Sequence, residues 1–253
     1  MVEALFWPAV LAYGEAAFAY AWPRSSRAAT WGVRVGWLLQ TALLIVQAAR
    51  TDGFPWSTWA GSLNLFVWFV VGTYLIWGCR PRYRLLGLAV MPLAAVLFVV
   101  ARVGGGTSAG ESSDYGNLFL VLHVGLVLAA FAGFTLAAGL AGLYLWQESR
   151  LKRRAADILR LRLPPLAALE RLTWRTIAVS LPLLTLGLAA GVIRQRRDGG
   201  SLDALEAVTL LTWLVYSAFL VSRPSGRRAA YLALGGFVLV IVVRLALAGS
   251  HFT

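Results

Sequence analysis

The stretch "NLFLVLHVGLVLAAFAGFTLAAGLAGLYLWQESRLKRR", residues 117–154, decides the fold class of this chain. From residue 117 to 147 only His123 can carry a charge near neutral pH, and a dense group of arginine and lysine follows. A hydrocarbon core of about 30 Å is crossed by a helix of about 20 mainly apolar residues. The stretch therefore predicts a membrane-spanning helix that ends at a basic surface.

The rest of the chain has the same character. Hydrophobic residues make up 59% of the sequence, charged residues 13%, and the mean hydropathy is +0.72, which is far from the balance of a soluble domain. Further apolar segments lie at about 2–22, 30–49, 60–78, 85–103, 174–193, 203–222 and 229–249. We therefore predict an all-α polytopic integral membrane protein with eight transmembrane helices. Residues 1–253 are expected to form a single transmembrane domain, with four N-terminal helices in 1–116 and a four-helix core in 117–253.

The distribution of basic residues predicts the orientation, because short cytoplasmic loops retain Lys and Arg. Most of these residues fall in the odd-numbered connections, above all in the cytoplasmic segment 148–175, and fewer fall in the even-numbered ones. Both termini should therefore lie on the extracytoplasmic side.

The formal net charge of +12 follows largely from this topology. Contact with anionic lipids is the favoured explanation, and we expect no binding of nucleic acid. Residues 151–163 mix Arg and Lys with Ile and Leu at roughly helical spacing, until Pro164 and Pro165 stop the pattern. A basic interfacial helix is the simple interpretation, and a docking site for a cytosolic partner is the alternative.

Several kinds of chemistry are excluded by the residues that the sequence lacks. Cys79 is the only cysteine, so there is no disulfide framework, no CxxC redox pair, no cysteine-rich metal site and no CxxCH motif for covalent haem attachment. The glycines at 104–106 are not followed by a phosphate-binding lysine. Since no bond-making residue is evident, we do not expect the chain to be an enzyme by itself.

The two histidines of the chain are expected at the same, outer surface. His123 lies near the outer end of the fifth predicted helix, and His251 lies just past the eighth. Two neutral imidazoles that face each other across a gap are a standard way to hold haem iron in a membrane. A single interfacial histidine is more often a solvated side chain, so a scaffold with incidental histidines is the alternative.

Arginines near the same surface are candidates for contacts with an anionic ligand such as the haem propionates. Arg194 belongs to a group that departs from the positive-inside pattern. Arg244 precedes His251 by seven residues, which places both on one helical face if the helix continues that far. Snorkelling of Arg244, or a pair with Glu111, is an equal alternative.

Acidic residues give two further candidate features. Asp203, Glu206 and Trp213 fall on one face of the seventh predicted helix, although the acids could simply favour the helix dipole. Glu15 and Arg34 lie on neighbouring predicted spans at similar depth. We interpret them as a structural ion pair rather than a proton path.

Residues 117–253 resemble the CcsA/CcmC cytochrome c assembly family. The likeness rests on the order of the opening stretch, "LERLTWRTIAVSLPLLTLGLAAGVI" at 169–193, "DALEAVTLLTWLVYSAFL" at 203–220 and a last helix ending in "AGSHFT" at 248–253. The chain is most similar to the small eight-helix, HemX-like branch of that family.

The resemblance implies a bis-histidine site, with His123 and His251 as axial ligands of haem b at the outer surface. Asp203 and Glu206 match the acids of the family's tryptophan-rich loop, and Trp213 matches a later tryptophan of that loop. These three residues are therefore expected to bind the cofactor, together with the candidate contacts Arg194 and Arg244.

The chain also departs from the family pattern. Leu202 and Val208 stand where the loop has tryptophans. The further histidine of CcsA-type members, near the inner end of the seventh helix, corresponds to about Leu220 or Val221. A two-site histidine relay therefore cannot operate in this chain alone.

The implied function is that of a haem b-binding membrane protein for cytochrome c assembly or haem handling, in the bacterial cytoplasmic (inner) membrane. Its implied partners are haem, a second cytochrome c assembly subunit and apocytochrome c. Two alternatives remain: a HemX-like regulator of tetrapyrrole biosynthesis, and a quinol-linked membrane b-type cytochrome.

Overall fold

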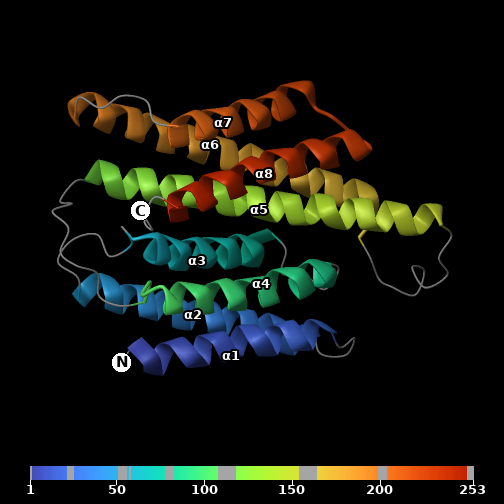
Figure 1. Cartoon of the computed structure of the whole chain (residues 1–253). Helices are drawn as coiled ribbons and strands as arrows, with labels where there is room; N and C mark the ends of the chain where they lie inside the picture. Colours follow the sequence, from blue (N-terminus) through green and yellow to red (C-terminus); the bar gives the residue numbers. More distant parts are fainter. Residues whose placement is uncertain are drawn as a thin grey trace. The chain divides into compact units, whose positions relative to one another are not determined.

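The structure is a computed structural model, and it is all-helical over the residues that it describes (Figure 1). The described residues are 2–21, 26–50, 56, 58–77, 83–107, 118–153, 164–198 and 204–249. Within them the helices are α1 (Val2–Ala21), α2 (Ser26–Arg50), α3 (Trp59–Trp77), α4 (Arg84–Val103), α5 (Leu118–Lys152), α6 (Leu166–Asp198), α7 (Ala204–Ser222) and α8 (Gly226–Gly249). The predicted all-α class is confirmed.

The chain divides into two compact units, Met1–Val121 and Leu122–Thr253. In the first unit, α1 packs against α2 and α4, and α3 packs against α4 and α2. In the second unit, α7 packs against α8 and α6, and α6 also contacts α8. Figure 1 draws the first unit from blue to green and the second from green to red. That the two units make one transmembrane domain stays a prediction.

Six helices of the described part are long and apolar enough to cross a membrane, namely α2, α3, α4, α5, α6 and α8. In α7 the apolar stretch Glu206–Ser222 is shorter. In α1, Pro8 and Glu15 interrupt the apolar sequence. A multi-pass arrangement is thus supported by the length and composition of six helices, whereas crossing by α1 and α7 and the side on which the termini lie stay predictions.

The first unit contains a chain of hydrogen bonds between buried neutral side chains. The Tyr13 hydroxyl donates to Gln40 Oε1 at 2.7 Å, and Gln40 Nε2 donates to Asn64 Oδ1 at 3.0 Å. Asn64 Nδ2 donates to Gln47 Oε1 at 3.1 Å, and Gln47 Nε2 donates to the Gly106 carbonyl at 3.0 Å. These four side chains are buried, where an unpaired polar group would be costly. The chain of bonds ties α1, α2 and α3 to the turn that follows α4.

The ion pair predicted between Glu15 and Arg34 is not formed. Both residues lie on exposed faces of α1 and α2, and the Arg34 guanidinium lies 5.4 Å from the centroid of the Trp31 ring. The exposure of both side chains shows that helical rotation directs them away from the interface of α1 and α2. Arg34 makes a cation–π contact on its own helix instead.

The backbones of α5 and α6 approach each other closely in an antiparallel register. A Cβ atom added at Gly187 would lie 2.8 Å from Val127 Cγ2 and 3.2 Å from the Val127 nitrogen. One added at Gly133 would collide with the Ser180 hydroxyl. Small residues at these contacts let two apolar helices pack backbone to backbone.

Both helices extend beyond the predicted apolar segments. α5 continues to Lys152 and α6 already begins at Leu166, and Gln147 Nε2 donates to the Pro164 carbonyl at 3.0 Å. Most of the predicted interfacial helix at 151–163 lies outside the described residues.

Candidate functional site

His123 lies on α5 and turns its ring toward α6. Its Nδ1 atom lies 2.7 Å from the Gly187 carbonyl oxygen. A carbonyl can only accept a hydrogen bond, so Nδ1 must carry the hydrogen. In the neutral imidazole this leaves the lone pair on Nε2, which is a common metal-binding atom.

The ring also rests against the α6 backbone at Gly191. A Cβ atom added there would lie 2.8 Å from both Cε1 and Nδ1 of His123, closer than such contacts normally are. Gly187 and Gly191 are four residues apart, so they share one face of α6. On this face, Gly191 lets the imidazole lie against the backbone, and Gly187 provides the carbonyl acceptor.

Trp213 contacts α6 at a similar level but from a different side. Its Nε1 atom, on α7, donates to Thr185 Oγ1 at 2.9 Å. Thr185 and Gly187 are two residues apart, which corresponds to about 200° of rotation around the helix and about 3 Å along it. The structure therefore brings the predicted residues His123 and Trp213 to one level of α6 without directing both to the same face.

The other predicted site residues are described only in part. Glu206 is half-buried in the first turn of α7. For Arg194 on α6 and Arg244 on α8 the description covers the backbone, and their side chains lie outside it. His251 and Asp203 lie outside the described residues. Their roles remain predictions.

Sequence reasoning missed the glycines that hold the His123 ring. The signal was present as "GLAAG" at 187–191, a pair of small residues four apart in an apolar helix, which is typical of close helix contacts. Because that pattern does not say which side chain fills the space, His123 could not be assigned to it from the sequence.

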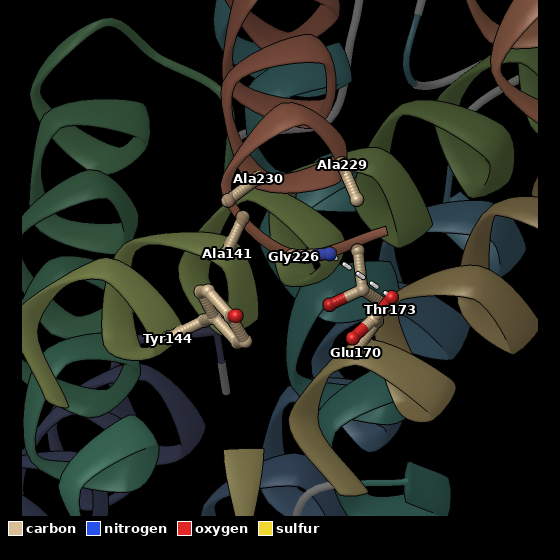
Figure 2. A pocket seen from close by; sticks show the side chains of 7 residues that line it. All are labelled: Ala141, Tyr144, Glu170, Thr173, Gly226, Ala229 and Ala230. Atoms are coloured by element: carbon tan, nitrogen blue, oxygen red, sulfur yellow. Dashed lines mark hydrogen bonds between the residues drawn. The ribbon is translucent and has the colours of Figure 1, made fainter. Parts of the chain in front are cut away.

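A second polar cluster lies far along α5 from His123. Tyr144 follows His123 by 21 residues, about 30 Å along a helix. It lines a small cavity of about 10 Å³ together with Ala141, Glu170, Thr173, Gly226, Ala229 and Ala230, with room for about one water molecule. Figure 2 shows Tyr144 on one side of this cavity and Glu170 with Thr173 on the other.

Acidic side chains in this cluster fasten the start of α8. Glu170 accepts a hydrogen bond from the Gly226 nitrogen at 3.1 Å, drawn as a dashed line in Figure 2. Glu148 on α5 accepts from Arg227 Nε at 2.8 Å and also pairs with Lys152 at 2.8 Å. The predicted basic segment 148–175 thus contains two acids, Glu148 on α5 and Glu170 on α6, that bind the start of α8.

His123 lies near one end of α5, and the cluster around Tyr144 lies near the other. Together with the six described helices of membrane-spanning length, this arrangement defines the chain as a multi-pass helical membrane protein. Residues 56–248 match the family described as cytochrome C assembly protein. The match covers most of the chain and includes all of the described site. The chain therefore belongs to the cytochrome c assembly family, as the predicted resemblance to CcsA/CcmC proteins indicated.

Individual relatives agree with this membership. The chain is 31% identical to the protein HemX of Brevibacillus brevis over 193 residues, which cover 75% of this chain and 71% of that protein. It is 27% identical to the cytochrome c biogenesis protein CcsA of Guillardia theta, over 81% of this chain and 77% of the relative. The CcsA protein of Microcystis aeruginosa is also 27% identical, over 85% of this chain and 82% of the relative.

Proposed function

We propose that this protein handles haem in cytochrome c assembly and holds haem b near the outer face of the bacterial cytoplasmic membrane, between His123 and His251. The observation that carries the proposal is the bond between His123 Nδ1 and the Gly187 carbonyl. Metal-bound histidines nearly always donate their other ring N–H to such an acceptor, which fixes the tautomer and the orientation of the ring. The contact of His123 Nδ1 with the Gly187 carbonyl has this arrangement.

The imidazole of His123 in the second unit is a nitrogen donor of the kind that binds haem iron. When bound, haem would supply an iron atom that accepts nitrogen ligands from histidine. His123 would provide one through Nε2. His251 is proposed as the other, because positive-inside counting predicts that both histidines lie at the outer surface, and the family resemblance implies the same.

Charged and aromatic residues are proposed to surround the porphyrin. Arg194 and Arg244 would pair with its propionates, since guanidinium groups bind carboxylates well. Asp203, Glu206 and Trp213 would belong to the remnant of the family's tryptophan-rich loop. Trp213 is fastened to α6 through Thr185, near the level of His123, which suits a position at the rim of the site.

The proposed partners follow from what this chain lacks. Covalent attachment requires the two thiols of a CxxCH motif, and Cys79 is the only cysteine here. The thiols would come from apocytochrome c, and a second assembly subunit would complete the attachment system. The proposed role of this chain is therefore to bind and orient haem while anionic lipids contact its basic segment.

The test is to purify the protein from haem-replete cells in mild detergent and to measure haem by pyridine haemochrome and absorbance spectra. The parent should bind about one haem b per chain in a low-spin, six-coordinate state. His123→Ala and His251→Ala should each give a high-spin or carbon monoxide-reactive form. Added imidazole should restore the low-spin spectrum of His123→Ala, because it replaces the lost ligand.

Two outcomes would contradict the proposal. The first is a parent that stays free of haem after haem is added back. The second is an unchanged spectrum in both histidine variants, which would assign any bound haem to other ligands.

The identity to HemX supports a second candidate, a regulator of tetrapyrrole synthesis. This relative is 31% identical over 75% of the chain, a higher identity than that of the CcsA proteins compared above. Deletion of the gene separates the two functions. Normal c-type cytochromes with altered haem precursors would favour the regulator, and loss of c-type cytochromes would favour the assembly role.

A further inference from the structure

We infer that Gly191 and the Gly187 carbonyl act together as a positioning device for the His123 ring, selecting its Nδ1–H tautomer so that Nε2 is the ligand offered to iron. This inference rests on the proposed haem site and adds the residues that would tune it. The position and tautomer of the ring are argued from contacts between α5 and α6 alone.

The Gly187 carbonyl can accept a second hydrogen bond because residue 191 is glycine. The Gly187 carbonyl belongs to a helix, where its usual partner is the backbone N–H four residues later, that of Gly191. A second donor must approach such an oxygen from the side of the helix, and the His123 ring does so where a Cβ of residue 191 would stand. Gly191 has no side chain, so the path is open and the Nδ1–oxygen distance falls to 2.7 Å.

The His123 ring occupies the space next to Gly191. The three atoms nearest to a Cβ added at Gly191 all belong to His123, at 2.8 Å from Cε1, 2.8 Å from Nδ1 and 3.6 Å from Nε2. The Nδ1 edge therefore faces α6 more closely than Nε2 does. A methyl group at this position would push away the edge of the ring that makes the hydrogen bond.

The register of α5 and α6 is set by a second close contact beside His123. Val127 touches Gly187, one helical turn along α5 from His123. The close contact at Val127 fixes the separation of the helices, and it therefore fixes how far the His123 ring stands from the carbonyl. Glycine at both 187 and 191 is needed for this geometry, since either side chain would separate the helices or the ring from its acceptor.

The consequence for a bound metal follows from general ligand chemistry. A hydrogen bond from Nδ1 to a carbonyl raises the basicity of Nε2, and loss of such an outer partner typically lowers metal affinity by about 10- to 100-fold. A more basic axial nitrogen stabilises ferric over ferrous iron. Loss of the bond should therefore raise the reduction potential of the haem.

The experiment first examines the haem-free chain. Only His123 and His251 are present, so the variant His251→Ala leaves one histidine whose ring nitrogens can be followed by ¹⁵N NMR. We expect protonated Nδ1 and unprotonated Nε2, the reverse of the usual preference of a free histidine side chain. Gly191→Ala should abolish this preference.

The matched control is Gly125→Ala. Gly125 lies on α5 close to His123, and a Cβ atom there would meet nothing within 4 Å. Both substitutions change the helix propensity in the same way, so only Gly191→Ala should alter the tautomer. In the His123→Ala background the clash disappears, and Gly191→Ala should then be tolerated as well as Gly125→Ala, which separates displacement of the ring from misfolding.

The second measurement uses haem-loaded protein with both histidines. Gly191→Ala should bind haem about 10- to 100-fold more weakly than the parent and show a higher reduction potential, whereas Gly125→Ala should match the parent. A parent with protonated Nε2, or a Gly191→Ala variant that keeps the parental tautomer and potential, would overturn the inference. A parent that binds no haem would instead overturn the proposed function, while the NMR result still decides the tautomer.

Discussion

Phe134 on α5 and Tyr216 on α7 stack face to face, with ring centroids 3.8 Å apart and ring planes at 8°. Both side chains are fully buried. The Tyr216 hydroxyl also donates to the Ala233 carbonyl on α8 at 3.2 Å. One aromatic residue thus joins three helices of the unit that carries His123.

Loss of the Tyr216 hydroxyl should weaken this unit modestly, and loss of a ring should weaken it strongly. Tyr216→Phe removes one buried hydrogen bond, worth about 1 kcal/mol, and Phe134→Ala removes a buried ring, at about 3–5 kcal/mol. Thermal unfolding in detergent measures both effects. Tyr231→Phe is the control, because Tyr231 is 59% exposed on α8; equal stability of the two Tyr→Phe variants would show that the Ala233 bond contributes nothing.

In the first unit, Gln40 should be the most sensitive member of the buried amide chain. Gln40→Leu leaves the Tyr13 hydroxyl without its acceptor and Asn64 Oδ1 without this donor, at about 1–3 kcal/mol for each orphaned group. Tyr13→Phe should be destabilising in the parent and less so, or stabilising, in the Gln40→Leu background. A double-mutant cycle measures this coupling, and additive effects would contradict it.

Two glycines of α8 should respond to alanine with opposite signs. Gly226 has a φ of +62°, a conformation that costs an alanine about 1–2 kcal/mol. Gly235 lies inside the same helix with open space where a Cβ would stand, so Gly235→Ala should stabilise the helix by about 0.5–1 kcal/mol. Unfolding temperatures of the two variants compared with the parent check this, and a shift of the same sign in both would refute the expected contrast.

The predicted topology can be tested through Cys79, which follows the end of α3 at Trp77. Because this end of α3 is predicted to be cytoplasmic, a membrane-impermeant maleimide should label Cys79 only after the cells are permeabilised. The control is Cys79→Ser combined with Ser108→Cys, in the predicted outer loop, which should be labelled in intact cells. The reverse pattern would invert the orientation and move both histidines to the cytoplasmic side.

The positions of the helices were largely predictable, whereas several of their ends were not. The apolar segment predicted at 174–193 lies within α6, but the helix begins at Leu166. The charges of Glu170 and Arg171 lie outside the predicted apolar segment, yet arginine is a good helix former. Hydropathy marks where hydrocarbon begins, and the helix itself can continue into water.

The neutral polar residues of the interior could not be connected from the sequence. Gln40, Gln47 and Asn64 are buried on α2 and α3, and none carries the charge that makes an intramembrane residue conspicuous. Charged Glu15 and Arg34 drew the prediction of a pair and instead lie on exposed faces. Depth along a helix can be counted from the sequence, but the face that it presents depends on how it packs.

By itself the sequence determined the helical class, the multi-pass character, the family and the choice of His123 as a candidate ligand, because apolar length and residue type do not depend on long-range contacts. Only the tertiary structure decided that His123 Nδ1 lies 2.7 Å from the Gly187 carbonyl and that Gly191 leaves room for the ring. It also decided that Trp213 Nε1 donates a hydrogen bond to Thr185 Oγ1. The physical reason is that a hydrogen-bond acceptor is selected by the register and rotation of two packed helices, which are properties of the pair and are absent from either sequence segment alone.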